Sequence, residues 1–197
     1  MSKLPDLFRE GLQSGWKTFS GEQNLPERIT CDVVIVGTGA GAGITAEVLT
    51  KAGLDVVLIE EGPLRTSSDF NQRESEAYST LYQESGARRS TDKSISILQG
   101  RCVGGTTVIN WTSSFRTPVD TLNHWQKEFE LADFSEEGMA PWFAQAEQRL
   151  NVHPWEGQPN ANNELLRTGS EKLGIKAKVI PRNIKGCWNL GSCGMGC

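Results

Sequence analysis

Glycines at a fixed spacing mark the first segment whose residue types could do chemistry. This glycine-rich segment reads, in order, Gly37, Thr38, Gly39, Ala40, Gly41 and Ala42. It matches the dinucleotide fingerprint, with alanine in the third small position. Gly37 permits a tight turn, Gly39 lets the backbone approach a pyrophosphate, and a following helix would offer free amides. The segment therefore predicts a dinucleotide site in which residues 37–41 contact the cofactor.

An acidic residue follows at the distance that such a site requires. Glu60 lies 23 residues after Gly37, close to the spacing of about 20 that is typical of dinucleotide-binding folds. Its carboxylate can accept hydrogen bonds from ribose hydroxyls and disfavours a ribose 2′-phosphate. FAD or NAD is therefore a better cofactor for this site than NADP.

A second glycine-rich segment, residues 100–111, distinguishes between these two cofactors. Gly104 and Gly105 permit close backbone approach, while Arg101 and the Thr106 hydroxyl can address a phosphate. The order Gly-Arg, two residues, Gly-Gly-Thr-Thr, two more residues and Asn110 resembles the signature with which glucose–methanol–choline (GMC) oxidoreductases enclose a flavin. The resemblance extends over residues 31–197.

Membership in this family would imply an FAD enzyme that transfers a hydride from a CH–OH group of an alcohol to the flavin. Asn110 would place its amide near that flavin. Some members carry a covalent flavin on a histidine directly before this asparagine, but this chain has Ile109 there. We therefore expect FAD to be bound noncovalently.

Three cysteines are candidate metal ligands. Cys187, Cys193 and Cys197 have the spacing C-x5-C-x3-C in a glycine-rich stretch. This pattern resembles a segment from a bacterial branch of the family, in which three thiolates hold an iron–sulfur cluster that passes electrons onward, so a cytochrome or quinone is a candidate acceptor. Free thiols, a disulfide, or a zinc site completed by His124 or His153 are alternatives.

No residue of the chain is assigned as catalytic. Alcohol oxidation needs a base, which the family supplies from a late histidine segment that is absent here. His124 and His153 are interpreted as packing or surface residues. We expect a fragment that supplies cofactor binding. The alternatives are a nonenzymatic flavin-binding fragment and an NAD-dependent or disulfide-type reductase.

The elements that must position these residues form a βαβ unit. Strands are predicted at 32–36 and 56–59, where apolar residues follow one another without alternation, and they flank a helix from Ile44 to Lys51 that Gly53 ends. This pattern is typical of parallel strands buried on both faces. Further helices are predicted near residues 74–82, 122–129 and 139–150, and a strand over 94–98. The fold class is α/β: a leader helix and loop (1–30), an incomplete Rossmann-like FAD-binding domain (31–118), and the start of an α+β substrate domain with a cysteine-rich end (119–197).

Composition excludes several classes of partner. The net charge is −4 and the pI is about 5.3, with no basic tract, so nucleic acid is an unsuitable partner. No apolar run approaches the roughly 18 to 20 residues of a membrane span, and the charged N-terminus does not resemble a signal peptide. We expect a cytoplasmic protein with a small alcohol as its substrate.

Overall fold

The computed structural model describes residues 5–21 and 25–196, and these form two compact units. The first unit runs up to Trp111 and includes the segment from Leu190 on, while the second spans Thr112–Asn189. The chain therefore leaves the first unit ahead of the predicted boundary at residue 118 and returns to it near its end.

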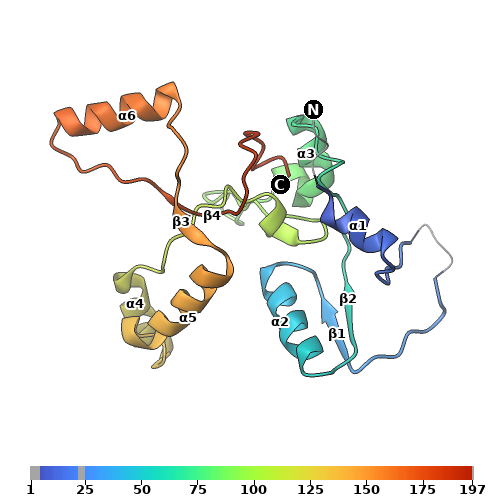
Figure 1. Cartoon of the computed structure of the whole chain (residues 1–197). Coiled ribbons are helices and arrows are strands. Elements are labelled where there is room, and N and C mark those ends of the chain that lie inside the picture. Colours follow the sequence, from blue (N-terminus) through green and yellow to red (C-terminus); the bar gives the residue numbers. More distant parts are fainter. Residues whose placement is uncertain (1–4, 22–24, 197) are drawn as a thin grey trace. The chain divides into compact units, whose positions relative to one another are not determined.

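The first unit contains the predicted βαβ motif. Strand β1 (Val33–Val36) and strand β2 (Val56–Ile59) pair in parallel, with Val33 opposite Val56 and Val36 opposite Ile59. Helix α2 (Ala40–Lys51) connects them, as Figure 1 shows in blue and cyan. The helix begins at Ala40, four residues before its predicted start, because the glycine-rich turn ends at Gly39. Gly53 follows its C-terminus with a φ of 89°.

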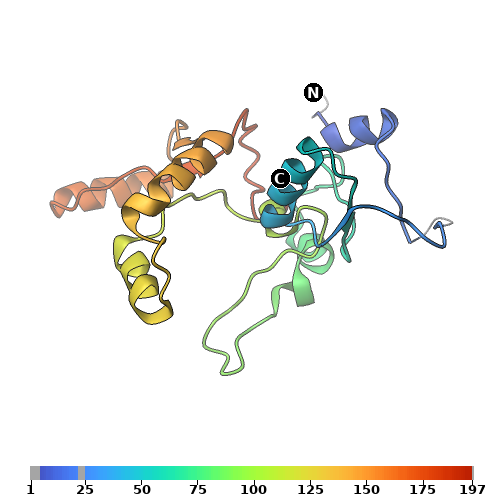
Figure 2. The same ribbon diagram turned by 90° about the horizontal axis from the view of Figure 1, so that it is seen from below.

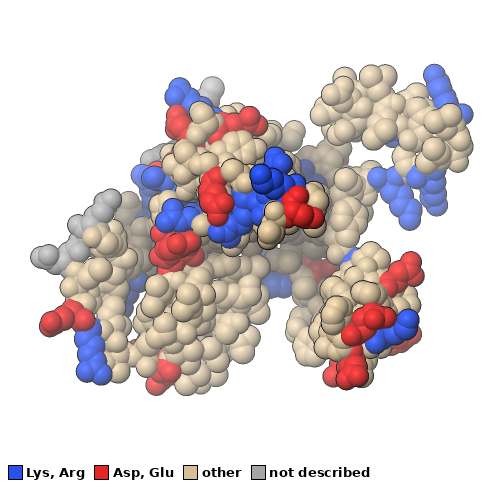
Figure 3. Space-filling view, turned by 180° about the vertical axis from the view of Figure 1, so that it is seen from behind, with Lys and Arg blue, Asp and Glu red and all other residues tan. Residues whose placement is uncertain are grey.

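The prediction that both faces of this sheet are buried is wrong for the described residues. Val34 is 54% exposed and Val36 is 84% exposed. The sheet has two strands, and its apolar side chains remain in contact with solvent together with Ile44 and Val48 of α2. Figure 3 shows few charged side chains over this sheet and helix. A continuous β-branched run indicates a strand that can be buried on both faces of a sheet. Burial also requires other elements to pack against those faces.

The predicted leader helix is present as α1 (Leu7–Gln13). Asp6 caps it by accepting the Arg9 backbone N–H at 3.0 Å. The same carboxylate accepts hydrogen bonds from the hydroxyls of Thr66 and Ser68, each at 2.6 Å. These bonds attach the helix to the loop that follows β2. Residues 1–4 and 22–24 of the predicted leader segment lie outside the described residues.

The core of the first unit forms around α3 (Glu74–Leu81), with the short 3₁₀ helices η1 (Gln83–Gly86) and η2 (Gly105–Val108) beside it. The buried residues of this core are Ala77, Leu81, Tyr82, Cys102 and Ile109. Met195 packs against them, and the Tyr82 hydroxyl donates a hydrogen bond to the Gly194 carbonyl at 2.5 Å. The final described residues are thereby fixed to the first unit.

The strand predicted over residues 94–98 is wrong. This segment forms a long loop, which Figure 2 shows without a strand arrow. An isolated bridge joins Ser96 to Arg89, and the Ile97 N–H donates to the Arg88 carbonyl at 2.9 Å. The alternation of Ser94-Ile-Ser-Ile had indicated a strand, but Ile95 and Ile97 remain exposed. Without a buried face, alternation does not produce a ladder.

The second unit is formed mainly by helices. Helices α4 (Val119–Phe129) and α5 (Glu136–Arg149) confirm the two helical patterns after Pro118. Strands β3 (Val152–Pro154) and β4 (Pro181–Asn183) pair antiparallel and flank helix α6 (Ala161–Lys172), none of which the sequence pattern had indicated. In the described part of the chain, no helix has the length and apolar character that crossing a membrane requires.

Candidate functional site

The first glycine-rich turn connects the end of β1 to the start of α2. Gly37 has a φ of 89°, and its N–H donates to the Ile59 carbonyl at 2.7 Å, which ties the turn to the end of β2. Gly39 is the N-cap of α2, and no described side chain caps the helix there. The first-turn amides of α2 are therefore available to an anionic group, which the helix dipole also favours.

Backbone-to-backbone packing brings the second glycine-rich segment onto this turn. A Cβ atom at Gly105 would lie 3.1 Å from the Cα of Gly39, closer than ordinary van der Waals contact. A Cβ at Gly100 would lie 2.4 Å from the Gly105 carbonyl carbon, and one at Gly62 would lie 2.4 Å from that of Arg101. Residues without side chains are required at these positions, since any other residue would push the segments apart.

Glu60 connects the same segments by hydrogen bonds. Its Oε2 accepts the Thr38 backbone N–H at 3.0 Å and the Thr38 hydroxyl at 2.6 Å, while its Oε1 accepts the Gly62 N–H at 2.9 Å. The Thr38 hydroxyl in turn accepts the Gly104 N–H at 3.0 Å. The carboxylate at the end of β2 thus organises the surrounding backbone.

A cleft of about 490 Å³ lies in front of these groups. It is lined by residues from β1, the glycine-rich turn, the end of β2 and the second glycine-rich segment: Val36, Gly37, Thr38, Gly39, Ile59, Glu60, Glu61, Gln83, Gln99, Gly100, Arg101, Gly105 and Thr106. The cleft opens at the carboxyl ends of parallel strands, where open α/β sheets bind their ligands.

Most of the predicted site residues meet at this cleft. Gly37, Thr38, Gly39, Glu60, Arg101, Gly105 and Thr106 line it, Ala40 and Gly41 form the first turn of α2, and Gly104 contacts Thr38. Asn110 is half-buried and is not among the lining residues. Sequence reasoning missed Gln83 and Gln99, which are adjacent because the Gln83 N–H donates to the Gln99 carbonyl at 2.9 Å. No motif marks either glutamine.

Two side chains at the cleft have partners that constrain their chemistry. The Arg101 guanidinium lies 3.4 Å from the Glu61 carboxylate, and both groups remain accessible to solvent. Cys102 is buried beneath the second segment, where its thiol contacts the Gly105 carbonyl at 3.6 Å. Burial, and then the negative charge of Glu60, raise the pKa of the Cys102 thiol to about 11. Cys102 is therefore a protonated packing residue near neutral pH.

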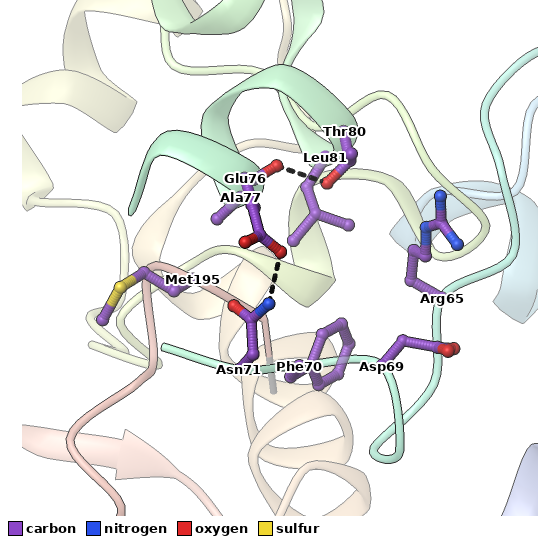
Figure 4. A pocket seen from close by; sticks show the side chains of 9 residues that line it. All are labelled: Arg65, Asp69, Phe70, Asn71, Glu76, Ala77, Thr80, Leu81 and Met195. Atoms are coloured by element: carbon purple, nitrogen blue, oxygen red, sulfur yellow. Dashed lines mark hydrogen bonds between the residues drawn. The ribbon is translucent and has the colours of Figure 1, made fainter. Parts of the chain in front are cut away.

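A second hollow of about 230 Å³ lies against α3 (Figure 4). Phe70, Leu81 and Met195 supply apolar side chains to it. The acidic groups at its rim already have partners, since Glu76 accepts a hydrogen bond from Asn71 and Asp69 pairs with Arg9 at 2.9 Å. The larger cleft, where Gly37 and Gly39 face open space, is the better candidate site.

The two predicted metal ligands that the structure describes, Cys187 and Cys193, do not form a metal site with other described residues. Cys187 is exposed and belongs to the second unit, whereas Cys193 is half-buried in the first. Cys197 lies outside the described residues. Among residues 5–21 and 25–196, no group of three His, Cys, Asp or Glu side chains is arranged to hold a metal ion. The iron–sulfur site stays a prediction.

The two histidines have local partners in the second unit. The His124 ring makes an edge-on contact with Phe129 at a centroid distance of 5.9 Å. The Nδ1 of His153 lies 2.7 Å from the Asn151 carbonyl oxygen. Both contacts agree with the interpretation of these residues as packing or surface groups.

Comparison with known proteins identifies the family. Long-chain-alcohol oxidase FAO3 of Arabidopsis thaliana is 35% identical over 98% of this chain and 26% of its own length. The uncharacterized GMC-type oxidoreductase Rv0492c of Mycobacterium tuberculosis is 36% identical over 87% of this chain and 28% of its own length. A solved structure, pyridoxine 4-oxidase from Mesorbium loti, matches 57% of this chain and 24% of its own chain at 22% identity, with a TM-score of 0.41.

The chain spans about a quarter of the length of these two curated relatives. Similar proteins occur in both plants and bacteria. The sequence model of the GMC oxidoreductase family matches residues 78–197, which is more than half of the chain. The chain belongs to the GMC oxidoreductase family.

Proposed function

We propose that this chain supplies the FAD-binding portion of an oxidoreductase that takes a hydride from the CH–OH group of an alcohol. The observation that carries the proposal is the cleft at the ends of β1 and β2, where two glycine-rich segments and an acidic residue converge. Membership in the GMC oxidoreductase family supports flavin chemistry. The relatives named long-chain-alcohol oxidases support an alcohol as the substrate.

The glycine-rich turn fits the pyrophosphate of FAD. A Cβ at Gly39 would meet no protein atom within 4 Å, so this glycine leaves space that the protein itself does not use. That space lies at the uncapped N-terminus of α2, where backbone amides can donate to phosphate oxygens. The absence of a side chain at Gly39 lets the pyrophosphate come close to these amides.

The groups beside the glycine-rich turn fit the adenosine portion of FAD. Glu60 offers a carboxylate for a ribose hydroxyl and would repel a 2′-phosphate. Arg101 lies at the cleft in an exposed ion pair with Glu61, and such pairs contribute only about 0 to 1 kcal/mol. The guanidinium can therefore exchange Glu61 for a phosphate oxygen at little cost.

When bound, FAD supplies the ring that accepts the hydride. Ile109 supports noncovalent binding, because it is 1% exposed and carries no group that could bond to the flavin. Its neighbour Asn110 carries an amide that could donate a hydrogen bond to the flavin, as the family resemblance implies. The catalytic base, the cytochrome or quinone acceptor and the bacterial branch stay predictions from the sequence.

Flavin retention tests the proposal directly. The purified chain is incubated with FAD, passed through gel filtration, and its absorption spectrum is recorded before and after acid precipitation. We expect flavin bands that co-elute with the protein and then appear in the acid supernatant. A parallel incubation with NAD⁺ and an iron assay of the same fractions test the rival cofactor and the cysteine site.

Three results would contradict parts of this proposal. Elution of the protein without flavin would refute the proposed FAD site. Flavin that remains in the acid pellet would show that the flavin is covalently bound to the protein, which would refute noncovalent binding. Retention of NAD⁺ in place of FAD would favour the reductase alternative.

A further inference from the structure

Thr38 holds together three segments of the candidate site through one side chain. Its hydroxyl donates to Glu60 Oε2 at 2.6 Å and accepts the Gly104 N–H at 3.0 Å. A hydroxyl has one donor and can accept at its oxygen, so a single group serves both partners. The glycine-rich turn, the end of β2 and the second glycine-rich segment are thereby linked in one chain of hydrogen bonds.

This linkage matters because glycines form the surrounding contacts. Gly104 has a φ of 95° and Gly105 a φ of 58°, and neither carries a side chain that could fix its position. Glycine also loses more conformational freedom than any other residue when it becomes ordered. The bond from the Gly104 N–H to Thr38 supplies an anchor from a segment 66 residues earlier in the chain.

The same bonds limit what Glu60 can still accept. A carboxylate offers about four acceptor positions, two on each oxygen. Oε2 already accepts the N–H and the hydroxyl of Thr38, and Oε1 accepts the Gly62 N–H. By this count the hydrogen bonds of the described residues leave one acceptor position of Glu60 open, and it lies on Oε1.

We propose that Thr38 is a positioning residue that orients Glu60 and Gly104 for the dinucleotide, leaving Glu60 able to bind one ribose hydroxyl. The assignment of a ribose to Glu60 rests on the proposed FAD site. The linkage between Thr38, Glu60 and Gly104 does not depend on it. The two parts can therefore be tested separately.

The linkage is tested by a matched pair of variants. Thr38→Val keeps the branched shape and removes the hydroxyl, whereas Thr38→Ser keeps the hydroxyl. Hydrogen–deuterium exchange is measured on the purified chain without ligand. We expect faster exchange over residues 100–108 in Thr38→Val, unchanged exchange over residues 119–149, and wild-type exchange in Thr38→Ser. Equal exchange over residues 100–108 in all three proteins would overturn the linkage.

The effect on the cofactor is measured by FAD titration of the same three proteins. Thr38→Val should weaken FAD binding about tenfold or more, because Glu60 loses the hydrogen bond that holds it in position for the cofactor. Thr38→Ser should stay within about threefold of wild type, since it retains that bond. A wild-type chain that binds no FAD would refute the proposed function, while the exchange experiment would still decide the linkage. Equal affinity of all three proteins for FAD would refute the positioning role alone.

The single ribose contact is tested with FAD analogues that lack either the 2′- or the 3′-hydroxyl of the adenosine ribose. The wild-type protein should bind one of the two analogues more weakly than FAD. Glu60→Gln should bind that analogue and FAD with equal affinity, and its preference between FAD and the other analogue should match that of wild type. Circular dichroism of Glu60→Gln checks that the variant is folded, and Thr38→Ser serves as a second variant that retains the carboxylate. If wild type binds both analogues more weakly than FAD and Glu60→Gln removes both differences, Glu60 binds two ribose hydroxyls, which would contradict the count of one free acceptor position.

Discussion

The backbone conformation and surroundings of Gly39 do not themselves require a glycine. Its φ of −67° is accessible to any residue, and a Cβ there would touch no protein atom within 4 Å. Gly105 differs, because its φ is 58° and a Cβ would approach Gly39. The fold accounts for glycine at position 105, whereas at position 39 it does not require glycine, which agrees with the proposed pyrophosphate site.

Replacing Gly39 by Val should therefore abolish FAD retention with little effect on folding. The branched side chain would occupy the space assigned to the pyrophosphate, while the loss of a glycine N-cap should cost about 1 kcal/mol or less. Gel filtration with FAD and thermal unfolding measure the two effects. Gly43→Ala is the control, since it adds a methyl to α2 in open space away from the cleft. Undiminished flavin retention in Gly39→Val would mean that the turn does not hold the pyrophosphate.

At the scale of single elements, helix α1 is attached by the Asp6 carboxylate and by the ion pair between Arg9 and Asp69. Asp6 is buried and accepts bonds from Thr66 and Ser68, about 60 residues away in the sequence. Burial by itself raises the pKa of Asp6. The hydrogen bonds from Ser68 and Thr66 outweigh it and hold the pKa well below the ordinary value of 3.8. The charged form of Asp6 is thus the form that holds the helix in place.

The attachment of α1 should depend on pH in a defined direction. Because the pKa is depressed in the folded state, the stabilisation is complete above the ordinary pKa of 3.8 and decreases as the pH falls below it. Asp6→Ala should loosen the helix at neutral pH, since Ser68 and Thr66 lose their bonds to the Asp6 carboxylate while the ion pair between Arg9 and Asp69 remains. Hydrogen exchange over residues 7–13 between pH 3 and pH 7 measures this loosening. Glu10→Ala, at an exposed position of the same helix, is the control and should leave exchange unchanged; slow exchange in Asp6→Ala would contradict the prediction.

At the scale of the whole molecule, the βαβ unit presents apolar side chains to water. Val34 and Val36 of β1 and Ile44 and Val48 of α2 are each more than half exposed. Exposed apolar patches of this kind mark surfaces that associate. A two-stranded sheet also leaves unpaired strand edges, which adds to this tendency. We expect the purified chain to bind hydrophobic dyes and to self-associate.

Two lysines on α2 should reduce that association. Ile44 and Val48 are one helical turn apart, and removing each half-exposed side chain should weaken apolar association by about 1 kcal/mol. The double variant Ile44→Lys with Val48→Lys should scatter less light and bind less dye than wild type. Thr45→Lys with Thr50→Lys adds the same charge at exposed polar positions and is the control. An equal decrease in both double variants would assign the effect to charge alone.

Local sequence patterns were sufficient for the elements that carry the site. The β-branched runs, the glycine-rich turn and Gly53 predicted β1, α2 and β2, because each depends on neighbouring residues. The spacing from Gly37 to Glu60 then fixed where the carboxylate would lie, since parallel strands end at the same edge of a sheet. A weak pattern failed over residues 94–98, where no buried face forms, and helix α6, none of whose residues is buried, was not predicted.

Other properties were decided only by the tertiary structure. Sequence spacing could not show that the Thr38 hydroxyl accepts the Gly104 N–H, that Cys102 is buried beneath Gly105, or that Gly194 returns to bond with Tyr82. These contacts join segments that are far apart along the chain or depend on how such segments pack. Periodicity reports only which face of an element is apolar. The partners of that face, and the hydrogen bonds that a buried polar group must find, are set when the segments come together.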